Sequence, residues 1–242
     1  MSHTAPAGTA HLTRGDLLRV IAADDGLSRL YSHVQQRMRS DAAHDLEHAL
    51  RVALWTLRLG GDGIDVREAV AAALLHDIVH VPKNDPARSR ASELSAAEAR
   101  TLLPEVGFDH AAVDRIADAI RDHSFSRGAV PDTPLGCALQ DADRLEALGT
   151  LGTFRCIATG VAMNAAFFDA DDPWARQRPL DDARFSTDHF FAKLLRLPAT
   201  MLTAAGRAEA GRRADIMVLL LRRLGRTTRF LLQPVAPARR RS

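Results

Sequence analysis

Apolar residues recur at intervals of three and four along most of this chain, which is the spacing that one face of an α-helix requires. In the segment 41–59 they form one stripe, at Leu46, Leu50, Ala53 and Leu57. Gly60-Gly61 follows, and helices commonly end at glycine. Strict apolar–polar alternation is absent, and aromatic residues, which favour strands, make up only 5% of the sequence. The sequence therefore predicts an all-α fold.

Capping residues and prolines divide the rest of the chain into further helices. Asp65, with Glu68 three residues later, has the pattern of an N-terminal capping box, and Pro134 suits a first helical position. The helices expected on this basis span about 12–39, 65–79, 95–106, 109–123, 135–149, 186–204 and 206–225.

These helices suggest one principal domain with an addition. We expect a helical domain over residues 12–168 and additional C-terminal helices over 169–232, packed on the same domain. The acidic, proline-containing stretch 167–182 predicts a surface loop. The polar start, 1–11, and the basic tail, 233–242, are expected to be disordered.

Composition excludes several classes of function. The net charge of +2 gives no basic field for a nucleic acid polymer or an anionic membrane. No apolar run approaches the roughly 18 residues of a membrane span, and the first residues lack the features of a signal peptide. Cys137 and Cys156 form neither a CxxC pair nor a plausible disulfide framework. A cytoplasmic location is expected.

The apolar run AVAAALL at 69–75 leads directly into His76 and Asp77. An imidazole and a carboxylate are costly to bury without partners. Either hydrogen bonds satisfy both side chains, or a charged species lies between them.

Other histidines and aspartates lie on separate predicted helices. His44 and His48 are four residues apart and therefore share a helix face. His123 ends another helix, and Asp141 and Asp143 lie on opposite shoulders of the apolar stripe of the next, so spacing alone does not choose between them. Imidazoles and carboxylates converging from several helices would suit Zn, Mn, Fe, Ni or Mg.

Three short motifs together carry a family resemblance. The chain reads HALRV at 48–52, LLHD at 74–77 and ADRL at 142–145. In order and spacing these motifs resemble the HD-domain metal-dependent phosphohydrolase superfamily. The stretches HDIVHVPKNDPARSRAS, IRDHSFSRG and LQDADRLEALGTLG are similar to its bacterial YedJ-like branch. The resemblance covers roughly residues 30–160 and implies an HD-type helical bundle.

The resemblance also implies a ligand set for one divalent ion (Mn, Ni, Mg, Fe, Co or Zn). The positions that match the family's metal ligands are His48, His76, Asp77 and Asp143. Asp141 and His44 are the candidates for orienting these ligands or a water. Binuclear relatives use a further histidine where this chain reads SELSAAEAR. That departure favours one ion, with a second ion as the alternative.

The implied activity is hydrolysis of a small phosphorylated metabolite, most simply a nucleotide, by attack of a metal-activated water on phosphorus. Asp77 is the candidate proton acceptor, and His123 the candidate contact to phosphate or water. Cations suited to bind phosphate are Lys83, Arg88 and Arg127. The protein is expected to be a monomer or homodimer.

Two alternatives remain at this point. A ligand-sensing regulatory HD module would bind metal without turnover. A di-iron oxygenase of the same fold would need a complete second set of metal ligands, which the sequence does not visibly provide.

Overall fold

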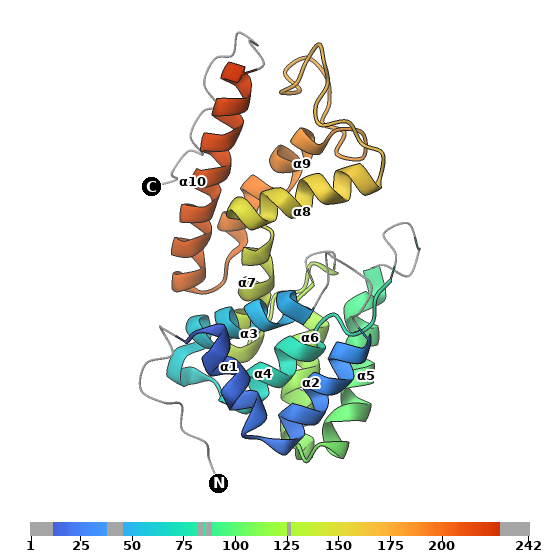
Figure 1. Ribbon diagram of the computed structural model, residues 1–242, viewed down its shortest axis with the longest axis vertical. Coiled ribbons are helices and arrows are strands. Elements are labelled where there is room, and N and C mark those ends of the chain that lie inside the picture. Colours follow the sequence, from blue (N-terminus) through green and yellow to red (C-terminus); the bar gives the residue numbers. More distant parts are fainter. Residues whose placement is uncertain (1–11, 38–45, 82–84, 86–88, 125–126, 228–242) are drawn as a thin grey trace. The chain divides into compact units, whose positions relative to one another are not determined.

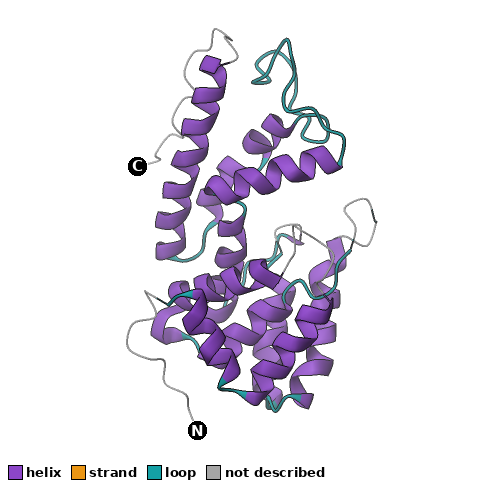
Figure 2. Ribbon diagram, in the orientation of Figure 1, coloured by secondary structure: helices purple, strands orange, loops and turns teal. Residues whose placement is uncertain are grey.

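The computed structural model describes residues 12–37, 46–81, 85, 89–124 and 127–227. Within these ranges the chain forms helices and loops and no strand, so the predicted all-α fold is confirmed (Figure 2). The two ends that we expected to be disordered, 1–11 and 233–242, lie outside these ranges, as do residues 228–232.

The chain forms two compact units, the first of which contains residues 1–146 together with 202–206. Its helices are α1 (Arg14–Ala22), α2 (Asp25–Arg37), α3 (Leu46–Gly60), α4 (Val66–Leu75), α5 (Ala91–Glu105), α6 (His110–Asp122) and α7 (Pro134–Glu146), with a short 3-10 turn η2 (Gly61–Gly63) (Figure 1).

Helix α4 is the buried centre of this unit. Every residue from Ala69 to Leu75 is fully buried, and α4 packs against α2, α3 and α6. Alanine makes this possible, because a side chain of one methyl group lets neighbouring helices approach closely while favouring the helical conformation. The helix is therefore a rigid support for whatever follows Leu75.

The start of α4 matches the sequence pattern only in part. The Asp65 carboxylate accepts a hydrogen bond from the Glu68 backbone N–H, as an N-cap should. The Glu68 carboxylate pairs with Arg115 on α6 rather than closing the predicted capping box. The helix also ends at Leu75, four residues earlier than expected, with His76 as its C-cap.

The single helix predicted over 12–39 is wrong, because α1 and α2 are separate. The Asp24 carboxylate accepts from the Leu27 N–H and so begins a new helix there. Arg67 of α4 donates to the same carboxylate across 2.8 Å. A local capping bond, supported by a contact with a distant segment, thus begins α2 where apolar spacing alone would continue one helix.

The second unit contains residues 147–201 and 207–242. Its helices are α8 (Gly149–Ala162), α9 (Ser186–Ala192) and η5 (Leu194–Thr200), and α10 (Ala204–Thr227) begins in the first unit and continues in this one. Gly149 has a φ of +71°, which only glycine adopts readily, and it separates α7 from α8. The predicted domain limits at 168–169 and the packing of a C-terminal extension stay predictions.

The stretch 167–182 is irregular, as predicted, and its own side chains hold it in place. The Asp172 carboxylate accepts from the backbone N–H groups of Arg176, Gln177 and Arg178. Arg178 also pairs with the buried carboxylate of Asp188. Among the helices of the described residues, none has the length and apolarity needed to cross a membrane.

We expect Ala72→Leu to destabilise the protein, because Ala72 is fully buried and three further carbon atoms would have to displace its neighbours. Overpacking of this kind costs about 1–3 kcal/mol in the free energy of unfolding. Ala97 is exposed on α5, so Ala97→Leu serves as the matched control and should change stability by less than about 0.5 kcal/mol. Denaturant titration of both variants measures the difference, and equal stabilities would contradict the central burial of α4.

Candidate metal centre

Four elements of the first unit bring five imidazole and carboxylate side chains together. His48 lies in the second position after the start of α3, His76 and Asp77 directly follow α4, His123 follows α6, and Asp143 lies on α7. These five residues form two overlapping groups, each of which could hold a metal ion: His48, His76 and Asp143, and His76, Asp77 and His123.

The first group joins α3, α7 and the end of α4. The Nε2 atoms of His48 and His76 are 3.3 Å apart. Asp143 Oδ1 lies 3.5 Å from His48 Nε2 and 3.9 Å from His76 Nε2. Three donor atoms therefore face a common point.

The second group is built around Asp77, whose two oxygens face different histidines. Asp77 Oδ2 lies 3.7 Å from His76 Nε2, and Asp77 Oδ1 lies 3.8 Å from His123 Nε2. His76 belongs to both groups, and its ring lies 5.2 Å from that of His48 and 5.1 Å from that of His123, centroid to centroid.

The backbone fixes the tautomer of two of the histidines. His76 Nδ1 lies 2.7 Å from the Ala73 carbonyl oxygen, and His123 Nδ1 lies 2.6 Å from that of Ile120. A carbonyl only accepts, so each Nδ1 carries the proton and each Nε2 presents a lone pair to the cluster. Both rings achieve this at a helix C-terminus, where the carbonyl three residues earlier lacks an intrahelical partner.

The protonation states suit a cation. Burial lowers the pKa of His76 to about 4, so its ring is neutral near pH 7. Burial acts to raise the pKa of Asp143, but its contact with His48 and the nearby imidazoles of His76 and His123 hold it below its ordinary value. Neutral imidazoles beside ionised carboxylates are the donor set that divalent metals take, so the residues present fit such an ion.

Asp141 and Asp143, which spacing did not distinguish, make different contacts. Asp143 faces the histidines, whereas the fully buried Asp141 carboxylate accepts from Leu202 N at 2.9 Å, Thr203 N at 2.7 Å and Thr203 Oγ1 at 2.8 Å. A Cβ at Gly206 would come within 2.4 Å of Asp141 Oδ2, so glycine is needed there. Asp141 thus anchors the segment that leads into α10.

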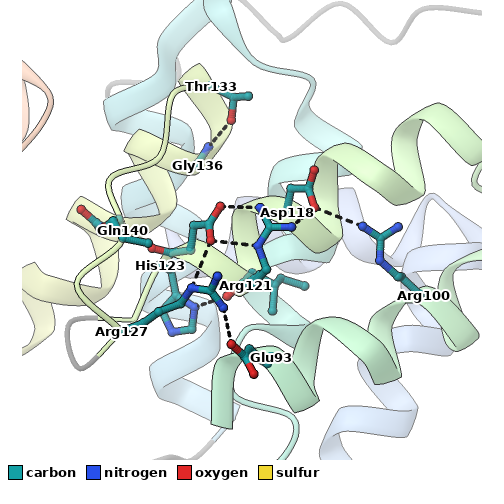
Figure 3. A network of polar contacts seen from close by, with 12 residues as sticks. Glu93, Arg100, Asp118, Arg121, His123, Arg127, Thr133, Gly136 and Gln140 are labelled. Atoms are coloured by element: carbon teal, nitrogen blue, oxygen red, sulfur yellow. Dashed lines mark hydrogen bonds and ion pairs between the residues drawn. The ribbon is translucent and has the colours of Figure 1, made fainter. Parts of the chain in front are cut away.

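Arg127 lies in a chain of ion pairs between α5 and α6 (Figure 3). Its Nη1 is 2.6 Å from Glu93 Oε1, and its Nε is 3.4 Å from Asp122 Oδ1. Asp122 also pairs with Arg121 and directly precedes His123. Arg127 is partly exposed near the end of α6. Three other predicted site residues, His44, Lys83 and Arg88, lie outside the described residues.

One buried acid beside the cluster was missed. Glu146 Oε2 lies 3.5 Å from His48 Nδ1 and 2.7 Å from Arg51 Nε. Its spacing of three residues from Asp143 places both on one face of α7 and could have suggested the contact. Glutamate is usually exposed at the protein surface, so the sequence alone gave no reason to select Glu146.

Comparison with known proteins agrees with this geometry. The model of the HD domain family matches residues 45–148, a range that includes all five cluster residues. The chain belongs to the HD domain family.

Individual relatives extend the match beyond that range. The chain is 32% identical over 189 residues to YpgQ of Bacillus subtilis (strain 168), a protein described as uncharacterized, and the match covers 76% of this chain and 83% of YpgQ. The crystal structure of YpgQ in complex with ADP is similar, with a TM-score of 0.64 and 28% identity over 83% of this chain and 96% of that one. An HD-superfamily hydrolase from Bacillus thuringiensis matches with a TM-score of 0.61 and 25% identity, over 84% and 96% of the two chains.

The two aspartates of α7 yield a paired prediction. Asp141→Ala should lower the free energy of unfolding by about 1.5–3 kcal/mol, because the donors that now bond to its buried carboxylate lose their acceptor. The same substitution should leave the divalent-metal affinity within about twofold of wild type. Asp143→Ala should instead weaken metal binding by at least about tenfold. Calorimetric metal titration and denaturant unfolding of both variants separate these effects, and the reverse pattern would contradict the assignment.

Proposed function

We propose that this protein is a metal-dependent phosphohydrolase acting on a small phosphorylated metabolite of the nucleotide class. The observation that carries the proposal is the convergence of three imidazoles and two carboxylates at the ends and faces of four buried elements. Packing alone does not require so many titratable groups in one place, and burying them is costly.

The ligands of one divalent ion in this proposal are His48, His76, Asp77 and Asp143. The ion is Mn, Ni, Mg, Fe, Co or Zn. When bound, such an ion supplies positive charge toward a phosphoryl group and acidifies water. The chain itself contributes the buried helix α4, which positions His76 and Asp77, and two histidines whose Nδ1–H groups donate to backbone carbonyls.

Two residues have further roles in the proposed reaction. Asp77 accepts the proton of the attacking water, since one of its oxygens faces His76 and the other faces His123. The His123 Nε2 accepts a hydrogen bond from that water or, when the ring is protonated, donates to a phosphoryl oxygen. Arg127, Lys83 and Arg88 supply positive charge to bind the phosphate.

The nucleotide class is supported by a relative and by charge. YpgQ of Bacillus subtilis was crystallised with ADP. The present chain has a net charge of only +2, which suits a small substrate better than a nucleic acid polymer. We infer a soluble, cytoplasmic enzyme, monomeric or homodimeric, of the YedJ-like branch.

A phosphatase screen tests the proposal directly. Purified protein is incubated with nucleoside mono-, di- and triphosphates and sugar phosphates, each with Mn, Mg, Ni, Co, Fe or Zn. We expect metal-dependent hydrolysis, reduced at least about 100-fold in Asp77→Ala by loss of the proton acceptor. Asp114→Ala, an exposed aspartate on α6, is the control and should retain full activity.

Three outcomes contradict parts of this proposal. Activity that survives Asp77→Ala would refute the role of Asp77. Metal and nucleotide binding without hydrolysis would favour the ligand-sensing module. Iron-dependent oxygen consumption without phosphatase activity would favour the oxygenase.

His123→Asn tests the proposed division between metal binding and catalysis. If His123 acts on phosphate or water, kcat should fall about 10²- to 10⁴-fold while the metal content stays near one ion per chain. Metal analysis together with steady-state kinetics measures both. A drop from two bound ions to one would show instead that His123 is the ligand of a second metal.

A further inference from the structure

We propose that Glu146, held by Arg51, is the positioning residue that fixes the His48 ring with its proton on Nδ1 and its Nε2 directed to the metal. The proposal deepens the proposed function and rests on its metal site. Backbone carbonyls orient His76 and His123, and the Glu146 carboxylate lies on the Nδ1 side of His48.

Each ring nitrogen of His48 lies near a different carboxylate. Its Nε2 faces His76 Nε2 at 3.3 Å and Asp143 Oδ1 at 3.5 Å, and its Nδ1 faces Glu146 Oε2 at 3.5 Å. Asp143 and Glu146 are three residues apart on α7, so one helix face presents a carboxylate to each nitrogen of the ring. A second carboxylate on the far nitrogen is the usual means of orienting a histidine ligand.

Arg51 secures the carboxylate in turn. Its Nε donates to Glu146 Oε2 at 2.7 Å, and it lies three residues after His48 on the same face of α3. Helix α3 therefore contributes His48 and Arg51 to this contact, and α7 contributes Asp143 and Glu146. Arg51 is about one-third exposed, whereas the Glu146 side chain is almost entirely buried.

The position of Glu146 is electrostatically unfavourable on its own. It is the last residue of α7, where the partial negative charge of the helix terminus repels a carboxylate. Its side chain is nevertheless almost entirely buried, with Oε2 3.5 Å from His48 Nδ1 and 2.7 Å from Arg51 Nε. A buried anion at this place is consistent with a role in orienting His48.

Metal affinity is the first readout. On metal-stripped protein, the apparent Kd for Mn²⁺ should rise about 10- to 100-fold in Glu146→Ala. Glu146→Gln should lose less, because its amide oxygen still accepts from Nδ1–H. Glu68→Gln is the matched control: Glu68 also pairs with an arginine, but it lies eight residues before His76, about 12 Å along α4.

A mutant cycle tests whether Arg51 acts through Glu146. Arg51→Met should weaken Mn²⁺ binding in the wild-type background and have little further effect in Glu146→Ala. Equal effects in both backgrounds would show that Arg51 acts independently and would overturn the relay.

The Nδ1 proton of His48 provides a readout that does not need activity. In NMR spectra of the protein saturated with Zn²⁺, which would bind His48 at Nε2 and leave its proton on Nδ1, we expect an exchange-protected Nδ1–H on His48, retained in Glu146→Gln and lost in Glu146→Ala. An unchanged proton in Glu146→Ala, with Mn²⁺ affinity within twofold of wild type, would overturn the proposal. Absence of phosphatase activity in wild type would refute the proposed function and leave this result standing. If Glu146→Ala does not fold, Glu146→Gln and Arg51→Met still decide through affinity.

Discussion

The burial of α4 is the constraint on which the rest of the first unit depends. Its alanines allow α2, α3 and α6 to pack closely around it. The helix ends inside the protein, so His76 and Asp77 emerge where an unpartnered polar group is costly. Their partners come from the surrounding elements: the Ala73 carbonyl, His48 and His123. The donor cluster is located where a buried helix stops.

Local signals predicted the fold well where helices begin with a capping side chain. Asp65 and Asp109 each accept from the backbone N–H three residues later and so cap α4 and α6. The break between α1 and α2 was missed because apolar spacing continues through it. Asp24 ends that continuity partly through Arg67, a residue 43 positions away, and no local pattern contains such a contact.

The candidate site was also predicted only in part from the sequence. The family motifs picked out the residues that the fold gathers, including Asp143, although helical phase alone left Asp141 equally eligible. The helical phase of a residue predicts the direction of its side chain, but it does not predict which residue the side chain contacts. Only the fold shows that Asp141 meets Leu202 and Thr203, and that Glu146 meets Arg51 and His48. Both contacts join residues that are distant in sequence.

Three acids on α7 thus interact with three different surroundings. Asp141 and Asp143 differ by two residues, about 200° around the helix, whereas Asp143 and Glu146 share a face. Rotating α7 about its axis would separate Asp141 from the segment 202–206 and also withdraw both carboxylates from His48. Because these contacts lie on opposite sides, each resists the rotation that would break the other. The helix is held in register from both faces, which is the rigidity that a set of metal ligands from separate elements requires.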